Sequence, residues 1–159
     1  LYGVVFDAGE KGVDQKATNE QRKRLRDARL AEATPPSGKT SALSEPSGDK
    51  WKSAVKFHPI LEIAVNGGGY GIRCSRCSHI FCGADKNYKN YALRWVVHLD
   101  DFMPNPLPSG EPFIGEFHEF FCPGCATQLQ VDVYCSHLGG DPIIWDTHIR
   151  TDRISAKTP

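Results

Sequence analysis

Two short cysteine motifs decide the fold of this chain: Cys74-Ser75-Arg76-Cys77 and Cys122-Pro123-Gly124-Cys125. A Cys-x-x-Cys step turns tightly enough to place both of its sulfur atoms on one metal ion, and two such steps supply the four thiolates of a tetrahedral zinc site. Proline and glycine inside the second motif favour the turn in which backbone amides point at metal-bound sulfur. The sequence therefore predicts a zinc site whose ligands are Cys74, Cys77, Cys122 and Cys125.

Two neighbouring residues are alternative ligands. Cys82 follows the first motif and can replace Cys74 or Cys77, and His79 lies close enough in the sequence to contribute an imidazole. The 44 residues between Cys77 and Cys122 exceed the roughly 15–20 of compact zinc ribbons, so we expect a loop and a strand between the motifs. Four thiolates close the coordination sphere, and a closed zinc site stabilises a fold without activating water. We therefore expect structural zinc and no catalytic residue in this chain.

Alternating apolar and polar residues around both motifs predict β-strands. These strands are expected at residues 61–65, 70–73, 91–99, 113–121 and 129–134. An Asn66-Gly67 step predicts a hairpin between the first two. A loop is expected at residues 100–112, which hold four prolines. Each cysteine motif thus follows a strand, and the second is also followed by one.

The N-terminal part differs from this pattern. Residues 1–7 have the apolar character of a short strand, and residues 17–33 contain good helix formers without proline or glycine. Five of these helical residues are basic: Arg22, Lys23, Arg24, Arg26 and Arg29. The apolar face of the helix is thin, so its basic face is either solvated or lies on an acidic or phosphate-rich surface of a partner subunit.

The composition divides the chain into four parts. Residues 34–50 are about half proline, serine and glycine, which is typical of an extended linker. The tail holds an apolar run, Ile143-Ile144-Trp145, which docks on another chain or packs back on its own domain. The predicted parts are a docking appendage at 1–33, a linker at 34–50, a zinc-ribbon-like domain at 51–138 and a docking tail at 139–159. The predicted fold class is mainly β: a zinc-ribbon-like antiparallel sheet domain with an N-terminal helical appendage and a Pro/Ser/Gly-rich linker.

Charge and hydropathy exclude several classes of protein. The chain carries 19 Lys and Arg residues and 19 Asp and Glu residues, so no global field attracts nucleic acid or an anionic membrane. No apolar run approaches the roughly 18 residues of a membrane span and no signal-peptide pattern opens the chain, so we expect a cytoplasmic protein. In a reducing cytosol its six cysteines are metal ligands and spare thiols. One function open to such a chain is that of a free-standing zinc-ribbon module that recognises nucleic acid or a regulatory protein; it is the alternative to the function that the next resemblance implies.

Three segments resemble the small zinc-containing subunit of the acetone and acetophenone carboxylases: RCSRCSHIFC at residues 73–82, EFFCPGCATQLQVDV at residues 119–133 and PIIWD at residues 142–146. The resemblance implies a complex with two large subunits, of the hydantoinase A and B types, which use ATP to form a β-keto acid from a ketone and bicarbonate. It places the catalytic residues, the ATP and a divalent metal in those large subunits. The Cys-x-x-Cys form of the first motif favours the acetophenone type.

A second resemblance concerns the N-terminal part. Residues 2–30 resemble the closing segment of hydantoinase B-type large subunits, in which a Tyr-Gly-Val-Val strand precedes a basic helix. The first residue is Leu1 rather than methionine. We therefore expect the zinc domain to be tethered to a large-subunit tail or to belong to a longer polypeptide.

Overall fold

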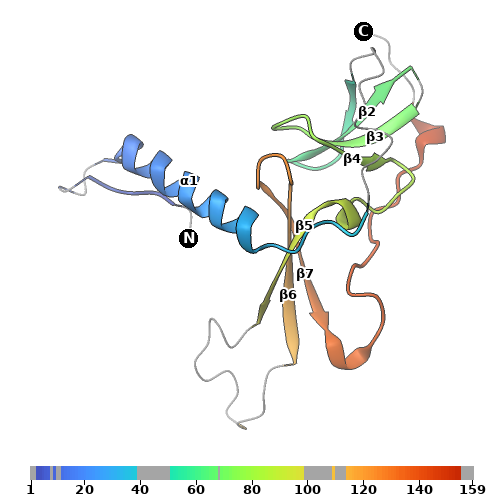
Figure 1. The fold of residues 1–159 in the computed structure, drawn as a ribbon. Coiled ribbons are helices and arrows are strands. Elements are labelled where there is room, and N and C mark those ends of the chain that lie inside the picture. Colours follow the sequence, from blue (N-terminus) through green and yellow to red (C-terminus); the bar gives the residue numbers. More distant parts are fainter. Residues whose placement is uncertain are drawn as a thin grey trace.

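One long helix and two antiparallel sheets make up the described part of the chain (Figure 1). The computed structural model describes residues 3–7, 9, 12–38, 51–67, 69–98, 109 and 114–154. The first sheet has the strand order β1 (Lys52–Lys56), β2 (Leu61–Asn66), β3 (Gly69–Cys74) and β4 (Ile80–Gly83). The second sheet has the order β5 (Leu93–His98), β6 (Gly115–Phe121) and β7 (Gln128–Cys135). The predicted mainly β fold with an N-terminal helix is confirmed.

The expected strands around the cysteine motifs are confirmed as β2, β3, β6 and β7, with small shifts of their ends. The strand expected at residues 91–99 begins only at Leu93, because Tyr88–Tyr91 form a short 3₁₀ helix, η1. Strands β1 and β4 have no counterpart among the expected strands. All five residues of β1 are exposed and β4 has only four residues, so neither carries a clear alternating pattern.

Two expectations concern segments that the structure describes only in part. Within residues 3–7 the expected strand is reduced to one isolated bridge between Phe6 and Val13. Apart from residue 109, the loop expected at residues 100–112 lies outside the described residues, as does the linker from residue 39 to residue 50. The first residues of the linker are ordered: Thr34 pairs with Arg94 of β5, and the Gly38 amide donates to the Asn90 carbonyl at 2.7 Å.

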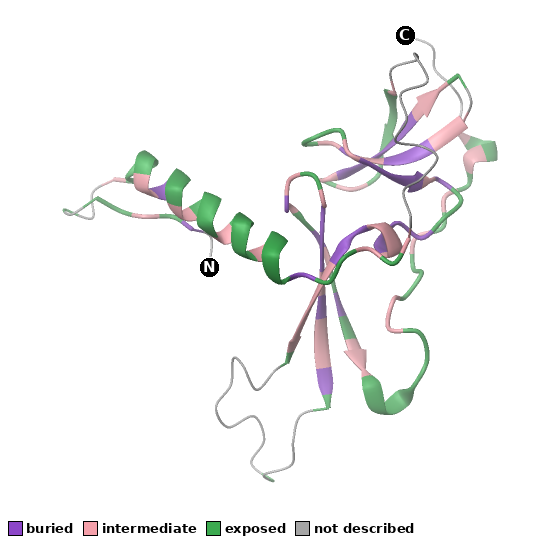
Figure 2. Cartoon of the chain, viewed as in Figure 1, coloured by how far each residue is buried: buried purple, intermediate pink, exposed green. Residues whose placement is uncertain are grey.

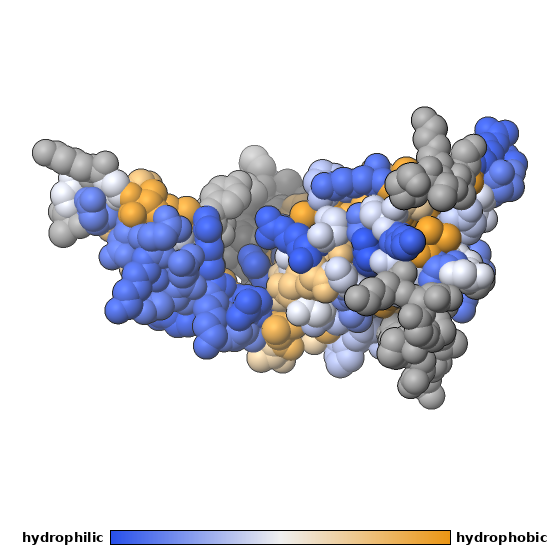
Figure 3. Space-filling view, turned by 90° about the horizontal axis from the view of Figure 1, so that it is seen from above, coloured by the Kyte–Doolittle hydropathy of each residue, from blue (hydrophilic) through white to orange (hydrophobic). Residues whose placement is uncertain are grey.

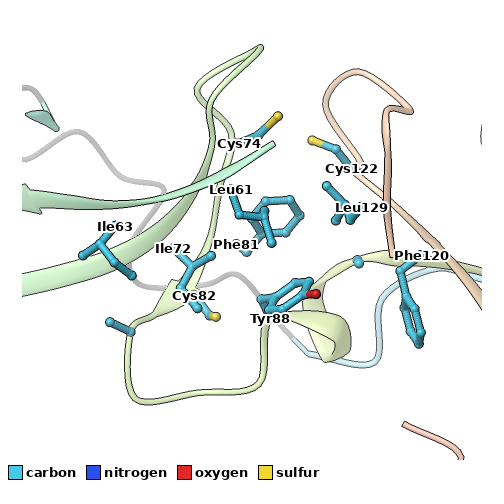
Figure 4. Packing of buried hydrophobic residues seen from close by; sticks show 12 residues of the cluster. Leu61, Ile63, Ile72, Cys74, Phe81, Cys82, Tyr88, Phe120, Cys122 and Leu129 are labelled. Carbon is cyan, nitrogen blue, oxygen red and sulfur yellow. The ribbon is translucent and has the colours of Figure 1, made fainter. Parts of the chain in front are cut away.

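The main core lies between the two sheets. Leu61, Ile72 and Phe81 enter it from the first sheet, while Phe120 and Leu129 enter it from the second, and each is at most 4% exposed (Figure 4). Cys74 and Cys122 belong to the same cluster, so the cysteine motifs lie at the edge of the core. Burial of this apolar surface holds the two sheets together.

The two faces of the second sheet differ in an unexpected way. The register places Val131 opposite Glu119, and Val133 opposite Phe117, on the face away from the core. Val131 is 45% exposed and Val133 is 65% exposed. On the other face, His118 and Asp132 are opposite one another and both are buried. The sheet therefore buries its polar face and leaves apolar side chains in contact with solvent.

The tail after β7 covers that polar face. The Pro142 carbonyl lies 3.1 Å from His118 Nδ1, and Lys89 Nζ lies 2.7 Å from Asp132 Oδ2 and 3.0 Å from Asp146 Oδ2. Ile143, Ile149 and Ile154 of the tail pack against the main core. This part of the tail packs back on its own domain, whereas Ile144 and Trp145 remain 43% and 45% exposed.

Helix α1 (Gln15–Glu32) extends away from the two sheets (Figure 1). Asp14 caps its start by accepting a 2.9 Å hydrogen bond from the Ala17 amide, and Thr18 is its only buried residue, so most of the helix surface is exposed (Figure 2). Its far end is anchored where Ala33 packs on Leu93 and Phe121. No helix in the described ranges is long and apolar enough to cross a membrane.

The buried Lys89 ammonium provides a test of this arrangement. Replacing Lys89 with methionine keeps most of the length of the side chain but leaves Asp132, which is 8% exposed, without its cation. We expect Lys89→Met to lower the free energy of unfolding by about 3–5 kcal/mol, because it strands a buried charge. Urea unfolding followed by circular dichroism measures the change. Lys86→Met, at an exposed position just before η1, is the matched control and should leave the stability unchanged.

Candidate metal centre

The two cysteine motifs form turns with the same hydrogen-bond pattern. In the first, the Ser78 amide donates to the Cys74 carbonyl at 2.9 Å and the Cys74 amide donates to the His79 carbonyl at 2.8 Å. In the second, the Ala126 amide donates to the Cys122 carbonyl at 2.7 Å and the Cys122 amide donates to the Thr127 carbonyl at 2.9 Å. The two turns are therefore equivalent, and each presents two cysteines on one side.

In both turns, the residue directly after the second cysteine has a left-handed backbone conformation. Ser78 has a φ of 63° and Ala126 has a φ of 50°, although neither residue is glycine. Such a backbone conformation is uncommon for residues with a Cβ atom and persists where the surrounding structure holds it. The sequence carries no signal for it, because glycine, the residue that usually marks a left-handed position, is absent there.

The four sulfur atoms of the predicted ligands come together at one point between the sheets. They all lie within 4.8 Å of one another, with 3.9 Å between the sulfurs of Cys74 and Cys125 and 3.5 Å between those of Cys77 and Cys122. In Figure 4, Cys74 and Cys122 approach this point from the two sheets. Four sulfurs bound to one tetrahedral zinc at about 2.3 Å lie about 3.8 Å apart. The arrangement of the donors therefore fits a metal ion, and the zinc-ribbon character of the fold is confirmed.

The electrostatics of the cluster differ from one cysteine to another. Burial raises the pKa of Cys77 to about 11 and also raises the pKa of Cys122. Burial acts in the same direction on Cys125, but hydrogen bonds with Thr127, whose hydroxyl lies 3.2 Å from the sulfur, and with Cys77 and Cys122 together outweigh burial and lower the pKa. A cysteine ligand of a metal must be a thiolate, so a cation has to compensate the cost of ionising four neighbouring thiols, of which those of Cys74 and Cys122 are buried. Thr127 thus contributes to the centre, although no motif in the sequence indicates it.

Gly124 allows the two turns to approach each other. A Cβ atom at this position would lie 3.0 Å from the sulfur of Cys77 and 3.1 Å from Cβ of His79. These contacts are tighter than ordinary van der Waals packing, so any larger residue pushes the first turn away from the second. The short distance between the turns therefore favours glycine inside the second motif, in addition to the turn geometry that the sequence predicts.

The two alternative ligands lie outside the group of four sulfurs. Cys82 is 2% exposed and its thiol lies 3.8 Å from the Lys86 carbonyl, while burial raises its pKa to about 12. His79 packs edge-on against Phe81 with 5.1 Å between ring centroids, and its buried Nε2 has no hydrogen-bond partner among the described residues. Burial lowers the pKa of His79, which favours the neutral ring. Cys82 thus belongs to the core, and His79 packs between Phe81 and Gly124 of the second turn.

The comparisons with known proteins agree with this geometry. The sequence model of the family described as acetone carboxylase gamma subunit matches residues 56–158, which contain both cysteine turns and the tail. Comparison with curated proteins found no match. The family match covers well over half of the chain and confirms the resemblance of its cysteine motifs to the small carboxylase subunit. The chain therefore belongs to the acetone carboxylase gamma subunit family.

Proposed function

We propose that this chain is the structural, zinc-binding small subunit of an ATP-dependent ketone carboxylase of the acetone or acetophenone type. One observation carries the proposal: the residues that match the family include four cysteines whose sulfur atoms are arranged for one tetrahedral metal. In this proposal the complex forms a β-keto acid from a ketone and bicarbonate. The large hydantoinase A-type and B-type subunits are its partners and bind the ATP and a divalent metal.

Zinc is the proposed metal because four-sulfur tetrahedral sites suit zinc. Zinc also has no redox chemistry, which fits a closed site with a purely structural role. Zinc supplies positive charge that keeps the four sulfurs ionised and cross-links the two turns. The residues of the chain do the rest: Thr127 stabilises the Cys125 thiolate, and the hydrogen bonds of both turns orient the cysteines. Saturation by four sulfurs supports the proposal that this subunit is not catalytic.

The exposed face of the second sheet is the proposed contact with the large subunits. The register places Trp95 and Val97 of β5 and Phe117 of β6 on the same face as Val131 and Val133. Glu119 is the one charged residue among these positions, and Trp95, Val97 and Phe117 are only partly buried. A contiguous apolar surface of this kind is typical of a protein–protein interface.

Metal analysis tests the centre. We expect about one zinc per chain, and Cys122→Ser should lose the metal and the native circular dichroism together, because the free energy of metal binding is largely folding free energy. Removal of zinc by a chelator should have the same effect on the domain after Trp51. Cys135→Ser, at a half-buried cysteine outside the group, is the control and should retain the zinc. A chelated chain that keeps its native spectrum would contradict the structural role.

The close approach at Gly124 gives a finer test. Gly124→Ala should keep the fold but lower the zinc affinity on the order of tenfold, because the added methyl group displaces the sulfur of Cys77. Competition with a chromophoric chelator measures the affinity. Ser75→Ala, in the other turn, adds no atom toward the sulfurs and should bind zinc as the unchanged chain does.

Assembly with the large subunits tests the function itself. The chain, co-expressed with both large subunits, should appear with them in native mass spectrometry as one stoichiometric complex. Val133→Glu should weaken that complex roughly tenfold or more, because it places a charge in an apolar contact, while the stability of the free chain changes by less than about 0.5 kcal/mol. Val55→Glu, on the exposed strand β1, is the matched control. An isolated chain that never joins the large subunits would refute the proposal.

A further inference from the structure

A cleft of about 370 Å³ separates helix α1 from the two cysteine turns. One wall is a row of basic residues on α1: Arg22, Lys23, Arg26 and Arg29. The cysteine turns form the other wall. Arg76, between the cysteines of the first turn, lines it, as do the residues from Cys125 to Gln128 at the second turn. The cleft thus exists only where the helix and both turns are held together.

The cleft carries more positive than negative charge. Five of the residues that line it are cations, and none is a carboxylate. Asp27, next to the cleft, lies 4.0 Å from Lys23 and 3.6 Å from Arg26, and so compensates one of these charges. A zinc ion with four thiolates would add two negative charges beside Cys125 and would balance part of this positive charge. The positive charge is thus concentrated at the cleft, although the total formal charge of the chain is zero.

The basic side chains follow one stripe of the helix. Arg22, Arg26 and Arg29 are spaced by four and three residues, so they lie on one face over about 10 Å of helix length. The guanidinium of Arg29 is held over the ring of Phe121, 5.3 Å from its centroid. The surface over α1 is accordingly hydrophilic in Figure 3. A stripe of this length matches several successive carboxylates of an extended or helical segment better than it matches one small anion.

We propose that this cleft binds a carboxylate-rich polypeptide segment of a large carboxylase subunit. The identity of the partner rests on the proposed function, while the carboxylate chemistry rests on the cleft itself. Arginine forks pair with carboxylates in a bidentate manner, and Thr127 and Gln128 add polar groups at the second turn. The residues that line the cleft include no aromatic ring on which a nucleobase can stack, which favours a peptide over a nucleotide or nucleic acid.

The first test uses the zinc-loaded full chain and a fluorescein-labelled deca-glutamate peptide, with binding followed by fluorescence anisotropy. Arg26→Gln/Arg76→Gln removes one cation from each side of the cleft and should weaken binding on the order of tenfold, with a shallower dependence on salt. Lys16→Gln/Arg24→Gln removes two charges from exposed positions of α1 outside the cleft and should bind as the unchanged chain does. Equal weakening by both double variants would overturn the inference, because it would show an unspecific charge effect.

Competing ligands are distinguished in the same assay. Inorganic phosphate and ATP should displace the peptide only at concentrations that also act through ionic strength. A ten-nucleotide single-stranded DNA that binds more tightly than the peptide, and whose binding Arg26→Gln/Arg76→Gln weakens, would overturn the assignment in favour of nucleic acid. Displacement by ATP at low concentration would overturn it in favour of a nucleotide.

The complex separates this inference from the proposed function. Arg26→Gln/Arg76→Gln should release the large subunits at lower salt than Lys16→Gln/Arg24→Gln does, with a roughly tenfold weaker affinity at fixed salt. If the unchanged chain assembles and the cleft variant assembles equally well, the cleft proposal is wrong and the proposed function stands. If the unchanged chain does not assemble, the proposed function and the identity of this partner both fail.

Discussion

Four sulfur atoms within 4.8 Å of one another join the two halves of this domain. Cys74 ends β3 and Cys77 lies between β3 and β4, while the other two cysteines lie between β6 and β7. The cluster therefore bridges a four-stranded and a three-stranded sheet that share one core. Thiolates so close together repel one another, and burial, together with the neighbouring cysteines, raises the pKa of Cys77 and Cys122. A cation between the turns would lower the cost of ionising the four sulfurs, and binding of such a cation would therefore be coupled to folding.

The sequence predicts most of the centre and of the strands because both depend on short-range patterns. Cysteine spacing identifies the four sulfurs, and alternation identifies β2, β3, β6 and β7. The sequence leaves Cys82 and His79 open as ligands because the spacing permits them. The structure separates them from the cluster through the left-handed conformation of Ser78, which sets the direction of the chain beyond the first turn. No residue type at that position signals this conformation.

Short-range patterns do not predict which face of the second sheet is buried. Alternation along β7 shows that Val131 and Val133 share one face, and a simple amphipathic interpretation would bury them. The structure instead buries Asp132, because Lys89, from a segment far away in the chain, pairs with it and also with Asp146 of the tail. A period of two fixes which residues share a face but leaves open which face is inside, and here long-range ion pairing decides it.

Burial of the polar face of the second sheet has a consequence for assembly. Burying Lys89 with Asp132 costs desolvation that well-packed apolar residues would not cost, so the ion pair is poorly explained as a source of stability alone. Its effect is to specify that the tail covers this face of the sheet and no other. The apolar face with Val133 is thereby left uncovered on the side where α1 is anchored by Ala33, Leu93 and Phe121. A polar network that directs the chain's own tail to one face keeps the opposite face available for a partner subunit.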